Sequence, residues 1–234
     1  MDLDLGLQRA FDRVELVSGS IGDPGQGGMC LMSLVAFLAG EPHSDAPGCA
    51  SPLIQTFAVL VNDHMPHAAR QRLKPFAPRI IGTDDGFDPV RAAVLRHALA
   101  EEILAKAPGQ CLTGPAAPAK GRLAGLRRLW RWLRKDAHRR LLDRALSHDD
   151  GVDLAREAAR LIARSARHAQ DARERERHWD AAIGLLDRLC DVGAPVRRGP
   201  GMRAERLAQL ENTPRSRQNA SGREEEKVAL LLLL

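Results

Sequence analysis

Tyrosine is absent from this sequence, and phenylalanine and tryptophan together make up only 3% of it. Alanine, leucine and arginine are abundant instead; these residues favour helices, whereas aromatic and β-branched residues favour strands. Hydrophobic residues make up 44% and charged residues 28% of the 234 residues, which is ordinary for a folded protein and excludes disorder throughout. The composition therefore predicts an all-α protein.

Long apolar runs are also lacking. The longest, around residues 31–39 and at 230–234, are far shorter than the roughly 20 residues that cross a bilayer. No signal-peptide pattern opens the chain, and its four cysteines show no disulfide spacing. These absences predict a cytoplasmic protein with free thiols and no transmembrane segment, and they leave its oligomeric state open.

Helical periodicity, interrupted by glycine and proline, divides the first half of the chain into several predicted helices. Leucine and valine recur at helical spacing between Cys30 and Gly40, and Ser51 followed by Pro52 is typical of a helix start. These patterns predict a helical hairpin joined by residues 40–51. After it we expect short helices near 66–73 and 75–81, and a longer helix from Asp88 to about Lys106.

The second half has a different composition. Residues 108–120 contain three prolines and two glycines, as a linker does, and residues 152–190 fit either one long helix or two helices broken at an arginine-rich middle. From Pro195 onward no period is usable, which predicts disorder. The predicted organisation is a compact N-terminal helical domain (1–107), a linker (108–120), a basic helical hairpin or bundle (121–192) and a disordered tail (193–234).

The strongest functional signal is a basic amphipathic helix predicted over residues 121–146. Residues 120–145 carry ten basic and two acidic side chains, although the whole chain has a net charge of only +5. At about 100° per residue, a leucine stripe occupies one side of this helix and a basic face the other. The predicted binding residues on that face are Arg128, Arg131, Trp132, Lys135 and Arg139.

Trp132 stands among the basic residues of this face, where it could stack on a base or an arginine plane. The pattern predicts a non-catalytic interaction protein that binds either a polyanion, namely nucleic acid, or an acidic protein partner. A membrane surface is less favoured as the partner, because the leucine stripe would have to leave the core to reach it. Pairing of these arginines with acidic residues of the same chain is the interpretation that needs no partner.

A second hypothesis, from a different class, is a cysteine-dependent hydrolase. Cys30 lies at a predicted helix N-terminus behind a glycine-rich turn, where free amides and the helix dipole would lower a thiol pKa. His43 would be its base and Asp45 the carboxylate that orients the imidazole. Against this, the signatures of known cysteine proteases are missing, and a thiol in an apolar helix is usually a small core residue.

The same loop offers weak metal ligands. Cys30, His43 and Cys49, with His64 or His67 as a fourth ligand, could hold zinc, but no two cysteines have the tight spacing of a zinc site. A structural interpretation is favoured, in which these residues only turn the backbone and pack. No cofactor is predicted.

Several motifs of this region resemble an uncharacterised family of bacterial and phage-borne proteins. They are CLM at 30–32, AGEPHSD at 39–45, a Pro-x-Cys at 47–49 and RQRLKPFAPRIIGT at 70–83, with a looser likeness at 152–192. The chain departs from the family at Ser33, where an acidic residue is common, and in lacking most alanine-tryptophan repeats. The resemblance implies a shared helical fold and no particular activity.

Overall fold

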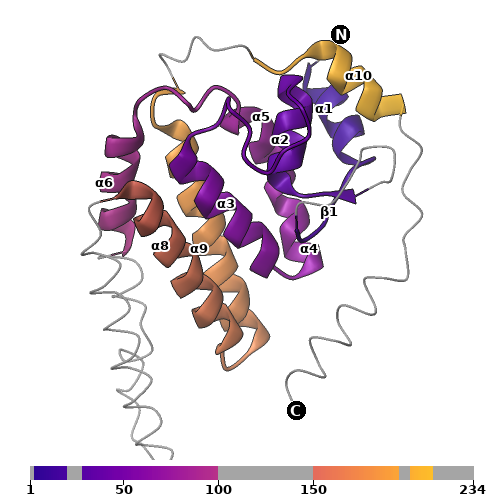
Figure 1. Ribbon diagram of the computed structural model, residues 1–234. Coiled ribbons are helices and arrows are strands. Elements are labelled where there is room, and N and C mark those ends of the chain that lie inside the picture. Colours follow the sequence, from indigo (N-terminus) through magenta and orange to yellow (C-terminus); the bar gives the residue numbers. More distant parts are fainter. Residues whose placement is uncertain (1–2, 20–27, 100–149, 195–200, 213–234) are drawn as a thin grey trace, which may run out of the picture.

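The structure is a computed structural model that describes residues 3–19, 28–99, 150–194 and 201–212. These residues are mostly helical, which confirms the predicted fold class (Figure 1). Within these ranges, no helix combines the length and the apolar character that crossing a membrane requires.

The predicted helical hairpin is confirmed. Helix α2 (Leu31–Ala39) is buried almost throughout and ends at Gly40, whose φ of 76° is the left-handed conformation that glycine adopts without strain. Helix α3 (Pro52–His64) begins where Ser51 accepts a hydrogen bond from the amide of Ile54. The two helices pack against each other.

The proline-punctuated stretch after α3 forms one unbroken succession of short helices, where the sequence predicts two. They are α4 (His67–Arg70), the 3-10 helix η2 (Gln71–Phe76) and α5 (Ala77–Ile80). The buried Arg70 joins this succession to α3, because its guanidinium donates to the carbonyls of Asn62 and Met65 at the end of α3. Helix α6 (Asp88–Ala98) follows, and the rest of the helix predicted to run to Lys106 lies outside the described residues.

Residues 152–190 form two helices, so the interpretation with a break is confirmed. Helices α8 (Gly151–Arg167) and α9 (Ala172–Asp191) pack together as a hairpin. Each has a side-chain N-cap: Asp150 accepts from the amide of Val152, and Asp171 accepts from the amide of Glu174.

Two terminal helices were not expected. The sequence places the first helix at Cys30, but α1 (Leu3–Phe11) precedes it, and α10 (Ala204–Asn212) lies inside the predicted disordered tail. The tail prediction is therefore wrong for residues 204–212, and residues 213–234 lie outside the description. The physical reason is mutual burial: α10 packs on α1 and α2, which removes Leu207 and Leu210 from solvent.

A very short parallel strand pair, also not predicted, follows α1. It consists of β1 (Glu15–Leu16) and β2 (Gly28–Met29). The side chain of Gln71 completes the edge of β1, because its Oε1 accepts from the amide of Leu16 and its Nε2 donates to the carbonyl of Leu16. Two residues per strand leave the fold class unchanged.

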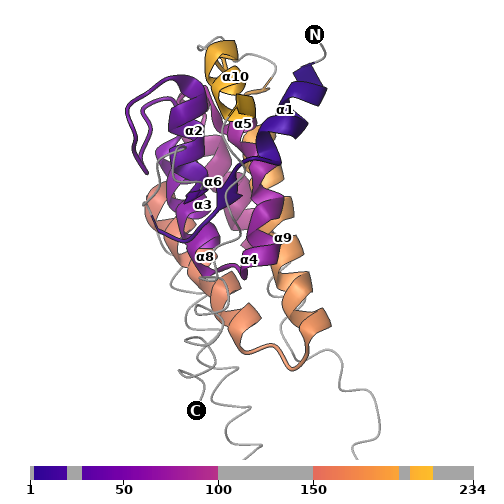
Figure 2. The same cartoon turned by 90° about the vertical axis from the view of Figure 1, so that its right-hand side faces the viewer.

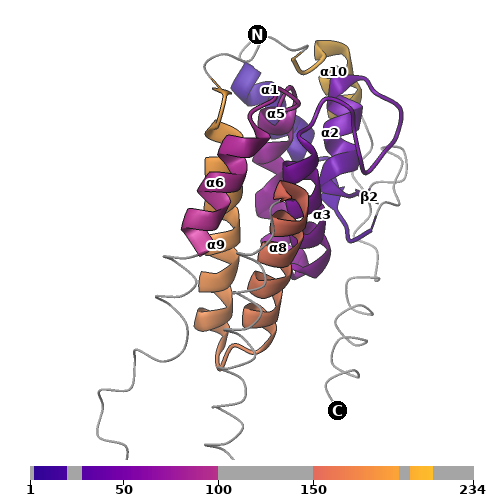
Figure 3. The same ribbon diagram turned by 60° about the vertical axis from the view of Figure 1, so that its left-hand side comes forward.

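One hydrophobic core joins the described residues on both sides of the predicted linker. Helix α8 packs against α3 and α6 as well as α9, and these four helices form the elongated part of the molecule, seen from a second side in Figure 3. Helices α1, α2, α5 and α10 gather at the other end, as Figure 2 also shows. The linker itself, 108–120, lies outside the described residues.

Candidate functional site

Cys30 is the N-cap of α2, as its predicted place at a helix N-terminus implied. Its side chain is 4% exposed; the sulfur accepts from the amide of Ser33 at 3.3 Å and lies 3.1 Å from the Ser33 hydroxyl. The thiol is thus used in capping the helix and is covered by the core. This geometry supports the structural interpretation of Cys30 over the catalytic one.

The loop that contains His43 and Asp45 is organised by Glu41. The carboxylate of Glu41 accepts from the amides of Gly48 and Cys49, at 2.7 and 2.8 Å, and so closes the turn. Burial, together with a hydrogen bond and charge repulsion from Glu41, raises the pKa of the Cys49 thiol to about 12. Cys49 is therefore a protonated thiol at neutral pH, and His43 and Asp45 are exposed on the same loop.

The proposed zinc ligands have other partners. His64 Nδ1 lies 2.8 Å from the carbonyl oxygen of Leu60, and His67 Nε2 lies 3.1 Å from Glu15 Oε1. Across the described ranges, which include all five candidate ligands, no group of three or more histidine, cysteine, aspartate or glutamate side chains is placed to hold a metal ion. The zinc hypothesis gains no support from these positions.

The predicted basic face cannot be placed, because Arg128, Arg131, Trp132, Lys135 and Arg139 all lie outside the described residues. A second basic surface lies within them, at the end of the α8–α9 hairpin. We call it the arginine cluster. It consists of Arg164, Arg167, Arg173, Arg175 and Arg177, all of them exposed.

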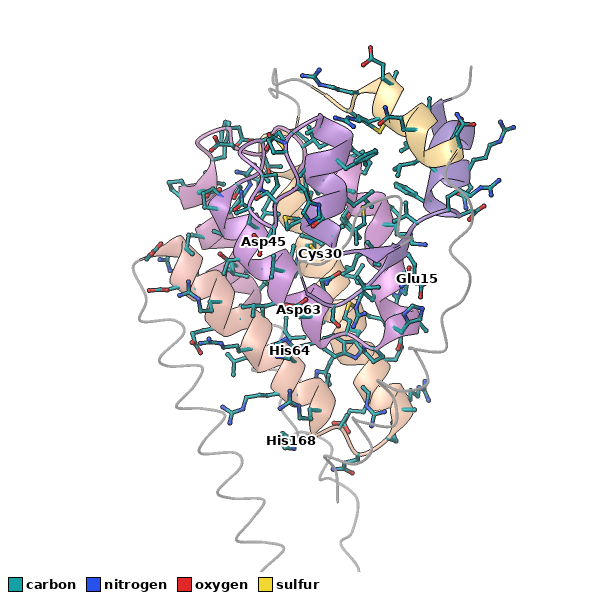
Figure 4. All side chains as sticks on the ribbon, turned by 45° about the vertical axis from the view of Figure 1, so that its right-hand side comes forward. Glu15, Cys30, Asp45, Asp63, His64 and His168 are labelled. Carbon is teal, nitrogen blue, oxygen red and sulfur yellow. The ribbon has the colours of Figure 1, made fainter. Side chains whose placement is uncertain are left out.

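The arginine cluster surrounds the turn at residues 168–171, within two helical turns of it on either side. The end of the hairpin points away from the rest of the bundle (Figure 1), and His168, labelled in Figure 4, marks it far from Cys30. The inward face of α8 is buried up to Ala166, in its last turn, whereas the first buried residue of α9 is Trp179, two turns after the helix begins. Arg164 and Arg167 therefore project from a helix whose opposite face is buried, and the arginines of α9 lie in the two exposed turns that follow the turn of the hairpin.

Acidic side chains of this region all have structural partners. Asp171 caps α9 by accepting from the amide of Glu174, and the Glu174 carboxylate accepts from the amide of Gln170, just before the cap, at 2.6 Å. Glu176 forms a salt bridge with Arg72, 2.5 Å between Nη1 and Oε1. Within the described part of the chain, no arginine of the cluster forms an ion pair.

Other basic residues of the bundle are neutralised internally. Arg72 bridges Glu176 and Asp180 of α9, and Arg79 bridges Asp187 and Asp191, about two and three turns further on. These pairs fasten η2 and α5 to α9. The arginine cluster differs from them because its positive charge has no internal carboxylate among the described residues.

Sequence reasoning did not single out the arginine cluster. The run ARSARHAQDARERERH was interpreted as solvated helix or as a break, without a binding role. The signal was available in the sequence, because Asp171 and Glu174 have the three-residue spacing of a capping box. That spacing marks a helix start and, with it, an end of the bundle where five arginines meet.

The resemblance to the bacterial and phage-borne family stays a prediction. Compared with known proteins, the chain matches no family model, no curated protein and no solved structure.

Proposed function

We propose that this protein is a non-catalytic helical protein that binds a polyanion, namely nucleic acid, through basic helical surfaces. The observation that carries the proposal is the arginine cluster, in which five exposed arginines have no carboxylate partner in the described part of the chain, while every neighbouring acid there is engaged. The basic face predicted over 121–146 would add to this surface.

The position of three of these arginines is locally unfavourable. Arg173, Arg175 and Arg177 lie in the first two turns of α9, and in the first turn, which contains Arg173, the helix dipole favours acidic side chains and opposes basic ones. Arg173 and Arg177 are also four residues apart, so their like charges repel. Residues that break a local rule without an internal gain are typical of functional surfaces.

The surroundings of the cluster favour nucleic acid over an acidic protein. Protein interfaces depend on apolar or aromatic side chains at their centre. Among the described residues, the one large hydrophobic side chain that is exposed is Val90, at the start of α6. The arginine cluster therefore offers charge and hydrogen-bond donors without an apolar anchor, which suits phosphate groups.

Binding to a labelled DNA duplex of about 20 base pairs, measured by fluorescence anisotropy at about 50 and 200 mM salt, tests the proposal. The double variant Arg167→Glu/Arg173→Glu should bind at least about tenfold more weakly at the lower salt, because two phosphate contacts are replaced by repulsion. Arg128→Glu/Arg131→Glu/Lys135→Glu tests the predicted basic face in the same assay.

The matched control is Arg9→Glu/Arg13→Glu, which changes the net charge equally on and just after α1, at the other end of the molecule (Figure 1). It should lose much less affinity than the cluster variant. Equal losses would show that only net charge matters and would remove the cluster as a site. A wild-type protein that binds neither DNA nor RNA would reject nucleic acid and leave an acidic protein as the partner to seek.

A further inference from the structure

Helix α8 carries a straight row of arginines along its outer face. Arg156, Arg160, Arg164 and Arg167 are spaced by four, four and three residues, so they fall within about a quarter of the helix circumference. We call them the arginine row; its last two members belong to the arginine cluster. At about 1.5 Å per residue the row is about 16 Å long.

The opposite face of α8 is buried along its whole length. Leu154, Ala158, Leu161 and Ile162 are at most 3% exposed and pack into the core between α3, α6 and α9. Because α8 packs against three other helices, only its outer face, which carries the arginine row, is open to a ligand. A ligand would therefore contact α8 along this face.

The first two arginines of the row differ from the last two in their ion pairs. Arg156 pairs with Asp153, and Arg160 pairs with Glu157 at 2.9 Å, whereas Arg164 and Arg167 have no ion pair among the described residues. Both arginines are open to solvent in these pairs, and ion pairs open to solvent contribute little, so a phosphate can compete for the first two arginines. All four are then available to a line of negative charges.

Aromatic stacking is not offered by this part of the molecule. Single-stranded nucleic acid is usually held by bases stacked on exposed aromatic rings. The sequence has no tyrosine, and no phenylalanine or tryptophan in the described ranges is exposed; Trp179, the one nearest the hairpin end, is 3% exposed. A surface of arginines without rings matches a backbone whose bases are already paired.

We infer that α8 lies along the sugar-phosphate backbone of double-stranded nucleic acid, with the arginine row contacting phosphates over about five base pairs and no base being read. The inference rests on the proposed function and names its substrate class. Recognition of this kind depends on salt and on duplex geometry, and it is independent of sequence.

The test measures the dependence of log Kd on log salt for a duplex, for one of its strands alone, and for a duplex of scrambled sequence. The wild type should bind both duplexes equally and the single strand more weakly. Arg164→Gln and Arg167→Gln should each reduce the magnitude of the duplex slope by about 0.9, the value of one phosphate contact. Arg9→Gln is the matched control and should leave the slope unchanged.

A variant that is expected to bind more tightly is also needed, because a gain in affinity cannot result from loss of the fold. Glu157→Gln removes the partner of Arg160 and should strengthen duplex binding more than Glu205→Gln, which makes the same charge change on α10. Unfolding temperatures of all variants are measured alongside.

The outcomes separate the two proposals. A wild type that binds no nucleic acid rejects the proposed function. If the wild type binds, then tighter binding of the single strand, a preference between the duplexes, or unchanged slopes in the Arg164 and Arg167 variants overturns the duplex inference and leaves the proposed function standing. Binding to heparin or anionic vesicles with higher affinity than to the duplex overturns it as well.

Discussion

Arg91 and Asp85 form a two-point salt bridge where the start of α6 meets the end of α9, with Nη1 to Oδ1 and Nη2 to Oδ2 distances of 2.7 Å each. Arg91 is completely buried, and it also donates to the carbonyls of Thr83, Leu189 and Val192. Burial alone would lower its pKa, but the hydrogen bonds to Asp85 and Asp88 raise the pKa above its ordinary value. The buried guanidinium is therefore charged and joins α6 to the end of α9.

Asp85→Asn should destabilise the protein by about 3 kcal/mol, because it leaves a buried positive charge with only part of its compensation. Urea unfolding followed by circular dichroism measures the change. Asp84→Asn removes an exposed neighbouring charge and should change stability by less than about 0.5 kcal/mol. Equal stability of the two variants would contradict the role given to Asp85.

The raised pKa of Cys49 makes stability fall at high pH. The unfolded thiol loses its proton near its ordinary pKa of 9.0 and the folded thiol near 12, so the folded state holds more protons between these values. The stabilisation from Cys49 is full below about 9 and is lost as the pH rises towards 12. Cys49→Ser should show a shallower decline in unfolding free energy over this range; an identical decline would contradict the shift.

Charge reversal at the arginine cluster should separate stability from binding. Arg173→Glu should stabilise the protein by about 1 kcal/mol at low salt, because it places an acid at the N-terminus of α9 and turns a repulsion with Arg177 into an attraction. Arg167→Glu, in the last turn of α8, should destabilise it by about 0.3–1 kcal/mol.

Both variants should bind duplex DNA more weakly, although their unfolding temperatures move in opposite directions. Thermal unfolding and anisotropy on the same samples measure the two effects. If affinity simply followed stability, Arg173→Glu would bind more tightly than the wild type, and the cluster would have no direct part in binding.

The burial of Cys30 predicts an inert thiol. A maleimide probe at pH 6 should leave Cys30 unlabelled in the folded protein and label it in urea, as mapped by peptide mass spectrometry, because the sulfur is covered and hydrogen-bonded to Ser33. Selective labelling of Cys30 in the folded protein would instead support the hydrolase hypothesis with His43 as base.

Local signals explain which parts of the fold were predictable. Gly40, Ser51 and Pro52 act within their own turn of the chain, so their effect can be recognised from neighbouring residues. Helix α10 has only the three-residue spacing of Leu207 and Leu210 as a local signal, and these two residues are buried only because α1 and α2 lie beside them. Because the segments on either side are rich in arginine, glycine and serine, the sequence of this region resembles a disordered one.

The candidate site was also only partly predictable from the sequence. Charge runs can be counted in a sequence, but whether a charge is neutralised depends on pairs such as Arg72 with Asp180, which are 108 residues apart. Arg72 and Arg167 are both basic residues near the hairpin, and only the three-dimensional arrangement distinguishes the one with carboxylate partners from the one without them.

The packing of α10 on α1 has a consequence for how the chain folds. The amide of Arg203 donates to the carbonyl of Leu38, and its side chain to that of Ala39, across 164 residues of sequence. Closing so long a loop costs conformational entropy before any contact forms, and it is therefore slow. Helices α8 and α9, by contrast, meet through a turn of four residues. We therefore expect the α8–α9 hairpin to form early and the packing of α10 on α1 and α2 to form last. In hydrogen exchange, these contacts of α10 should be the first to open.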